Sequence, residues 1–107
     1  MSDLDFTICC TVTFFSKKRR TPPNLNNGKY CPHLVVKGSE QLLGVNFIDG
    51  EDVTFDKQIG ANALPENEAV DYSILQEGTE FLIMEGSAIV GEGIVKEIFQ
   101  HKPYRSK

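Results

Sequence analysis

The chain lacks several features that would point to a particular chemistry. It has no tryptophan, two histidines and three cysteines among 107 residues. It also has no phosphate-binding loop of the form Gly-x-x-x-x-Gly-Lys-[Ser/Thr]. Because that loop defines the nucleotide-binding part of a P-loop enzyme, we expect this chain neither to bind nor to hydrolyse GTP.

Long hydrophobic runs are absent as well. No segment approaches the roughly 20 apolar residues that a membrane-spanning helix needs, and the N-terminus has no basic stretch followed by an apolar one. We therefore expect no membrane contact and, by default, a cytoplasmic location.

The few cysteines and histidines do not form a recognisable site. Cys9, Cys10 and Cys31 lack the paired spacing of a zinc site or of a redox Cys-x-x-Cys motif, so we expect reduced structural thiols. Consecutive side chains of a strand face opposite sides, which predicts that at least one of Cys9 and Cys10 is buried. Cys9 and Cys10 are not convincing nucleophiles, because only His33 and His101 could serve as a base and nothing local pairs them with either thiol. We expect no enzymatic activity and no cofactor.

Charge is unevenly placed along the chain. The formal net charge is -4, which argues against a general nucleic-acid binder because Lys and Arg supply most of the affinity for phosphate. The dense basic run is Lys17-Lys18-Arg19-Arg20, whereas residues 66–80 contain five acidic residues and no Lys or Arg. Both segments are typical of solvated loops, and the basic run is also a candidate phosphate contact.

Length and composition fit one small domain. With 40% hydrophobic and 24% charged residues, 107 residues are enough for one core and too few for two. We expect a single domain over residues 1–107, with its core at about residues 6–99 and a polar tail at residues 100–107.

Short strand-like runs separated by turn residues predict an all-β fold. The expected strands cover residues 5–16, 30–37, 41–48, 51–56, 69–75, 79–84 and 91–100. Residues 17–28 are predicted to form a long loop, Asp49-Gly50 a turn, and residues 59–68 an irregular segment. A helix over residues 65–75 is the main alternative, but the alternation of apolar and polar residues there favours a strand. Six or seven strands indicate a small antiparallel barrel or sandwich.

The glycine-containing segment at residues 85–95 is the most informative stretch. Glu85-Gly86-Ser87 separates two apolar runs and is predicted to reverse the chain in a hairpin. Gly91 and Gly93 then interrupt a strand, where glycine marks a bend, a bulge or a close approach of backbones.

This segment resembles the end of the third domain of bacterial elongation factor Tu. The pattern in that family is Arg-Glu-Gly-Gly-Arg followed by x-Val-Gly-x-Gly-Val-Val. The matching residues here are Glu85, Gly86, Val90, Gly91, Gly93 and Val95, and upstream Ser16-Lys17, Thr21-Pro22, Asn27-Gly28, Tyr30 and Pro32 also match in order. The resemblance spans roughly residues 6–99. It implies a stand-alone six-stranded Greek-key barrel, without the GTPase domain.

The resemblance also implies binding roles. In the family, this domain helps to bind the T-arm of aminoacyl-tRNA, contacts the nucleotide exchange factor and packs against the GTPase domain. Arg19 and Arg20 align with an Arg-His pair that contacts the tRNA backbone, and Gly86 aligns with a glycine that lets the tRNA backbone approach closely.

Other positions depart from the family. His33 stands where the family has a tRNA-contacting Gln, Leu42 where it has Thr, and Asp71 where it has Lys. Cys31 and Ala88 each replace an Arg. The change at Asp71 reverses the charge, and a carboxylate facing phosphate weakens binding.

Two functions remain open from the sequence. The first is a non-enzymatic binding module that acts through protein–protein interaction, as a mimic of the elongation factor domain. The alternative is a tRNA- or RNA-binding module of the translation apparatus, and an enzyme ranks last. The candidate binding residues are Lys17, Lys18, Arg19, Arg20, His33 and Gly86.

Overall fold

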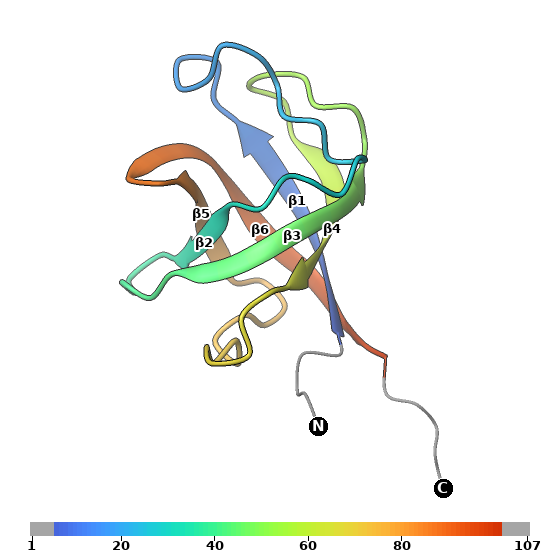
Figure 1. Ribbon diagram of the computed structural model, residues 1–107, viewed down its shortest axis with the longest axis vertical. Coiled ribbons are helices and arrows are strands. Elements are labelled where there is room, and N and C mark those ends of the chain that lie inside the picture. The colour runs from blue at the N-terminus through green and yellow to red at the C-terminus, as the bar shows by residue number, and fades with distance from the viewer. Residues whose placement is uncertain (1–5, 102–107) are drawn as a thin grey trace, which may run out of the picture.

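Six antiparallel strands close into a barrel (Figure 1). The structure is a computed structural model that describes residues 6–101. Around the barrel the strands follow the order β1-β4-β3-β2-β5-β6. Their bounds are Phe6–Phe14 (β1), His33–Val36 (β2), Leu43–Gly50 (β3), Ile59–Pro65 (β4), Glu80–Glu85 (β5) and Ala88–Gln100 (β6).

The strand order is that of a Greek key. β2, β3 and β4 are consecutive neighbours, and β1 lies beside β4, although the long segment of residues 15–32 links β1 to β2 in the chain. The all-β fold and the small antiparallel barrel of six strands are confirmed. None of residues 6–101 is helical, so the alternative helix over residues 65–75 is wrong.

Alternating burial along β1 shows how the core is built. Every second residue of this strand points into the barrel and is buried, while the residues between are half-buried on the outside. Cys10 is inside and Cys9 outside, which confirms that one of the two thiols is buried. The largest fully buried side chains are Phe14, Phe47, Phe81, Ile8, Leu25, Leu34, Leu43 and Ile83.

Gly93 is required by the close packing of β6 against the core. A Cβ atom at this position would lie 2.6 Å from the carbonyl oxygen of Thr11 and 2.6 Å from Cζ of Phe81. Both neighbours are fixed in the barrel, so no side chain fits there. The predicted close approach of backbones is therefore present, and a bulge between Ile83 and Met84 lies in the same β5–β6 pairing.

The segment at residues 59–65 was predicted to be irregular, and this was wrong because it forms β4. Its small residues have low strand propensity, but the segment pairs with both β1 and β3. Ile59, Ala61 and Ala63 alternate into the core. Pairing on both sides outweighs the local preference, and Pro65 stands at the last position of the strand.

Two predictions around residue 50 were also wrong. Asp49 and Gly50 belong to β3 instead of forming a turn, and residues 51–56 form a loop instead of a strand. The side chain of Asn26 explains the extension of β3, because Nδ2 donates to the carbonyl oxygen of Gly50 (3.0 Å) and Oδ1 accepts from its amide (3.1 Å). These two bonds satisfy the backbone groups of Gly50 on the side away from β4, while Asp49 and Gly50 pair with Asn62 and Ala61 of β4.

The strand predicted at residues 69–75 was wrong for a different reason. Here the chain crosses one end of the barrel, and the buried side chains of Tyr72 and Leu75 join the core. The Tyr72 hydroxyl donates to the carbonyl oxygen of Gly44 and accepts from the amides of Glu66 and Asn67. The apolar residues that suggested a strand therefore plug the barrel end.

The remaining predictions concern loops and chain ends. Residues 17–28 form the predicted loop, and Gly86-Ser87 form the predicted hairpin turn. Gln100, predicted as the first residue of the polar tail, is instead the last residue of β6. Residues 1–5 and 102–107 lie outside the described part, including Asp5 of the predicted first strand and most of that tail.

Candidate binding surfaces

Arg19 joins the long loop to the β5–β6 hairpin through a cluster of three side chains, here called the Arg19 cluster. Nη1 of Arg19 forms an ion pair with Oε2 of Glu85, and the hydroxyl of Tyr30 donates to the same oxygen (2.6 Å). The Arg19 guanidinium lies 5.4 Å from the centre of the Tyr30 ring. The cluster therefore combines an ion pair, a hydrogen bond and a cation–π contact.

The aromatic core holds the Arg19 cluster in place. The Tyr30 ring stacks on Phe47 at 5.8 Å and meets Phe14 edge-on at 5.9 Å. Burial raises the pKa of the Tyr30 hydroxyl, the Glu85 carboxylate raises it further, and Arg19 acts in the opposite direction. Tyr30 is therefore neutral at physiological pH and acts as a hydrogen-bond donor to Glu85.

The structure brings most of the predicted site residues to one end of the barrel. Arg19 is tied to Glu85, the residue before Gly86, while Lys17, Lys18 and Arg20 are exposed in the same loop. Gly86 has φ 62° in the hairpin turn, a conformation that favours glycine. His33 begins β2 and pairs with Met84 of β5.

Asp71 lies at the other end of the barrel. Its segment packs near the start of β1, where the ring of Tyr72 meets that of Phe6 at 6.1 Å, whereas the basic loop follows the end of β1 (Figure 1). The amide of Ser73 donates to the Asp71 carboxylate and lowers its pKa. Asp71 thus does not share a surface with the basic run.

An apolar surface covers the outside of β2, β5 and β6. Val35 lies between the inward-facing Leu34 and Val36, so it faces outward, yet only 9% of it is exposed and it is outside the central core. Leu82 pairs with Val35 in the β2–β5 register. The residues of this surface, here called the apolar face, are Val35, Leu42, Leu82, Met84, Ile89 and Ile94.

Register and exposure support this grouping. Met84 stands opposite Ile89, and Glu80 opposite Ile94. Leu42 precedes β3 and, on continuing the β2–β3 register, falls opposite Val35. Leu42 is 49% exposed, and Ile89 and Ile94 are each 37% exposed. Outward positions of an antiparallel strand are normally polar, so six apolar ones side by side need an explanation.

Charged side chains cross this face. Nζ of Lys37 lies 3.1 Å from Oε1 of Glu80 and 3.5 Å from Oε1 of Glu92, and these hydrogen-bonded carboxylates raise the pKa of the lysine. All three side chains are about half exposed. The face therefore carries two carboxylates and one ammonium group.

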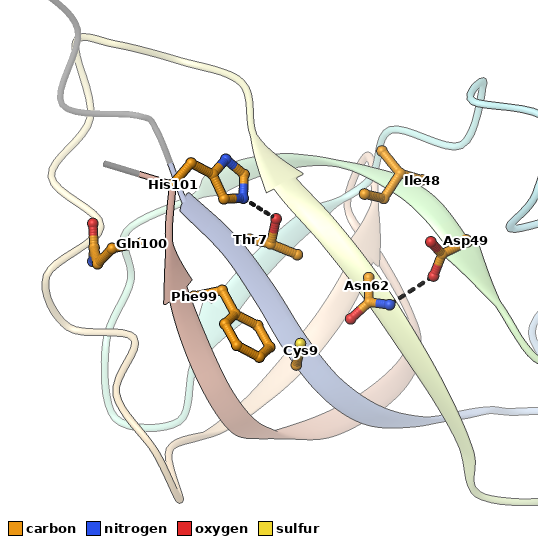
Figure 2. A pocket seen from close by; sticks show the side chains of 8 residues that line it. All are labelled: Thr7, Cys9, Ile48, Asp49, Asn62, Phe99, Gln100 and His101. Carbon is orange, nitrogen blue, oxygen red and sulfur yellow. Dashed lines mark hydrogen bonds between the residues drawn. The ribbon is translucent and has the colours of Figure 1, made fainter. Parts of the chain in front are cut away.

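A groove lies on the outside of β1, β3, β4 and the end of β6 (Figure 2). Its volume is about 380 Å³. Nδ2 of Asn62 donates to Oδ1 of Asp49 (2.7 Å) on one side, and Oγ1 of Thr7 and Nε2 of His101 share a hydrogen bond (2.6 Å) on the other. The groove is lined by Thr7, Cys9, Ile48, Asp49, Asn62, Phe99, Gln100 and His101.

The three cysteine thiols all have raised pKa values. Burial raises the pKa of the thiols of Cys9, Cys10 and Cys31, to about 12 for Cys10. A raised pKa leaves less thiolate, which is the nucleophilic form. Among the described residues, no three His, Cys, Asp or Glu side chains are placed to hold a metal ion.

Comparisons with known proteins do not assign the chain. No protein family matches it, and no curated protein is similar to it. Over residues 6–101 there is also no helix that could cross a membrane.

Sequence reasoning missed the partners of Arg19 and the apolar face. Arg19 and Glu85 are 66 residues apart, and no local pattern links them. The apolar face did leave a signal, because the runs Leu34-Val35-Val36 and Phe81-Leu82-Ile83-Met84 are continuously apolar. A strand covered on one face alternates, whereas a continuous run indicates that both faces are covered.

Proposed function

We propose that this chain is a non-enzymatic binding module that acts through protein–protein interaction, with the apolar face as its contact surface. The observation that carries the proposal is the set of outward-facing apolar residues on β2, β5 and β6, of which three are 37–49% exposed. Contiguous exposed apolar surface on a folded protein marks an interaction site. Burying it against a partner is favourable at roughly 25 cal/mol per Å² before the costs of association are subtracted.

Charge favours a protein partner over a nucleic acid at this face. Glu80 and Glu92 outnumber Lys37, so the face would repel phosphate. Apolar side chains at the centre with charged side chains between and around them are typical of protein interfaces.

The resemblance to the third domain of elongation factor Tu supports a more specific form of this proposal. A barrel of that kind would engage a protein that normally recognises the domain in the elongation factor, and so act as its mimic. The six-stranded Greek-key barrel and the Gly86 turn are compatible with this role.

A matched pair of variants tests the proposal. The chain is immobilised, proteins are captured from a bacterial lysate, and those retained by the wild type are quantified with Leu82→Lys and with Leu64→Lys. Leu64 is the matched control because it is a half-buried, outward-facing leucine on β4, on the other side of the barrel. We expect Leu82→Lys to lose the captured partner and Leu64→Lys to retain it. Equal capture by both variants would refute the assignment to the apolar face.

The mimic is tested separately by competition. The purified chain is titrated into a complex of bacterial elongation factor Tu with its nucleotide exchange factor. Displacement by the wild type but not by Leu82→Lys would support the mimic. If no displacement occurs at a large molar excess of the chain, the nucleotide exchange factor is not its partner.

RNA binding remains the second candidate, and the Arg19 cluster is the observation that favours it. The cluster ties the basic loop to Glu85, the residue before the Gly86 turn, and Lys17, Lys18 and Arg20 are exposed in that loop. Changing these three cations to Ala should weaken RNA binding and lower the salt slope by roughly 1 for each phosphate that is no longer neutralised. RNA affinity that is the same in the triple variant and the wild type would exclude this role.

A further inference from the structure

The groove presents an aromatic ring beside acidic groups, and it lies over β1, β3, β4 and the last residues of β6, away from the apolar residues of β2 and β5. The Phe99 side chain is 49% exposed there, next to Cys9 (Figure 2). Within the described part of the chain, residues 6–101, neither Lys nor Arg lines the groove. A large exposed aromatic ring in a concave surface needs an explanation.

Two carboxylates flank the thiol at the centre of the groove. Glu97 stands directly opposite Cys9 in the β1–β6 register, and Asp49 lies beyond Asn62 on the opposite side. The carboxylates of Glu97 and Asp49 add to the effect of burial in raising the pKa of the Cys9 thiol. Two carboxylates thus lie on either side of Cys9, and carboxylates beside a concave surface favour a cationic ligand.

Strand geometry shows which carboxylate can touch a ligand that stacks on Phe99. Glu97 and Phe99 are two residues apart on one strand and share a face, which separates their Cα atoms by roughly 6.6 Å. Asp49 is three strands away from β6, or about 14 Å along the sheet. Glu97 is thus the contacting carboxylate, and Asp49 acts at longer range.

The Arg19 cluster shows which group binds between an aromatic ring and a carboxylate elsewhere in this protein. There a tyrosine ring and a carboxylate hold the guanidinium of Arg19 between them. Phe99 lines the groove, Glu97 stands two residues before it on the same face of β6, and among residues 6–101 no arginine lines the groove. A planar guanidinium suits both at once, because it stacks on a ring and pairs with a carboxylate through its forked donors.

We infer that the groove binds the guanidinium group of an arginine side chain from another protein, stacked on Phe99 and paired with Glu97. The site is separate from the apolar face and does not depend on it. Asn62 keeps Oδ1 of Asp49 occupied, so that carboxylate is held in position at the rim. Citrulline, a neutral side chain of the same shape as arginine, could form neither the ion pair with Glu97 nor the cation–π contact with Phe99.

The test is an NMR titration of the ¹⁵N-labelled full chain with three capped tripeptides. These are acetyl-Gly-Arg-Gly-amide, its citrulline isostere and its lysine counterpart. We expect the arginine peptide to shift the resonances of Cys9, Asn62 and Phe99 and to saturate, the lysine peptide to bind more weakly, and the citrulline peptide to cause no saturable shift. Equal binding of arginine and citrulline peptides, no binding at all, or shifts confined to Glu80 and Glu92 would overturn the inference.

Variants locate the contact. Phe99→Leu keeps an apolar side chain but removes the ring, and Glu97→Gln removes the charge, so each should weaken the arginine peptide about two- to fivefold. Glu80→Gln, an acidic residue on the apolar face, is the control and should leave the affinity unchanged. Binding that appears only when Lys102 and Arg105 are both changed to Ala would assign the groove to the chain's own cations and would also overturn the inference.

Discussion

The two sides of the barrel differ on the outside although they are alike on the inside. Every strand sends apolar residues into one continuous core. On the outside, β2, β5 and β6 carry the apolar face, whereas β1 exposes Thr7, Cys9, Thr11 and Thr13. Inward positions are dictated by the packing of the core. Core packing does not dictate the residues at outward positions, and for this reason we propose the side with the apolar face as a contact surface.

The largest effect on stability is expected when an inward-facing glycine, Gly93, and an outward-facing one, Gly60, are each replaced by alanine. Gly93 faces the core, and a Cβ there would lie 2.6 Å from Phe81 and from the Thr11 carbonyl oxygen. Gly60 faces outward, and the nearest atom to its Cβ would be Oε2 of Glu51 at 3.4 Å. Gly93→Ala should lower the free energy of unfolding by about 3 kcal/mol through overpacking, and Gly60→Ala should change it by less than about 1 kcal/mol. Denaturant titrations of both variants would show the difference, and equal effects would contradict the close packing of Gly93 against Phe81 and Thr11.

Cys10 inside the barrel and Cys9 outside it should affect the stability of the fold at alkaline pH to different extents. Burial raises the pKa of Cys10 from 9.0 to about 12. Between these values the unfolded chain loses a proton that the folded chain keeps, so stability is fully present below pH 9 and falls as pH rises. One such group contributes a slope of about -1.4 kcal/mol per pH unit. Cys10→Ala should make the alkaline loss of stability shallower by roughly that amount.

The matched control is Cys9→Ala. Cys9 is on the outside, so its removal should change the slope less than removal of Cys10. Unfolding free energies measured at several values between pH 9 and 12 decide the matter. If the two variants have the same slope, then Cys10 does not sense the interior as described.

A smaller effect is expected at the end of the barrel where the loop meets the hairpin. Arg19→Ala removes the ion pair with Glu85 and the contact with Tyr30. Because the Arg19 and Glu85 side chains are 23% and 32% exposed, solvent screens the pair, and we expect a loss of about 1 kcal/mol. Arg20→Ala is the control and should stay within about 0.5 kcal/mol. Thermal melting of the two variants measures the difference, which vanishes if Arg19 is only a surface cation.

The smallest effect on stability is expected from Leu82→Lys and Leu64→Lys, the two variants that are compared in partner capture. Leu82 and Leu64 are both half-buried and outward-facing, so replacement of either by Lys keeps most of the aliphatic stem in place. We expect losses of about 1 kcal/mol or less, equal within about 0.5 kcal/mol. Matching melting temperatures would show that a difference in partner capture does not come from unfolding. A much less stable Leu82→Lys would place Leu82 in the core instead of on a binding surface.

The sequence predicted the parts of the fold that depend on local pattern. The alternation in β1 and the Glu85-Gly86-Ser87 turn of the last hairpin are visible in the residues themselves, and the all-β barrel follows from the spacing of strands and turns. β4 was missed because its glycine and alanine residues prefer no strand until β1 and β3 pair with them. Tyr72 was misread because its hydroxyl bonds are made only across the barrel end.

The candidate surfaces were predictable to different degrees. The exposed basic loop followed from the run of Lys and Arg, whereas the capture of Arg19 by Glu85 depends on a contact between distant segments. The apolar face could have been read from continuously apolar strands. The groove could not, because its lining comes from both ends of the chain and from two strands between.

The most direct test of a protein-binding apolar face is hydroxyl-radical footprinting of the chain with and without its captured partner. Met84 and Ile89 lie side by side on this face, and both react with the radical when exposed. The account predicts that labelling of these two residues falls in the complex, while labelling of Leu64 on the other side is unchanged. If the partner is bound and Met84 and Ile89 are labelled as fully as in the free chain, the apolar face is not the contact surface.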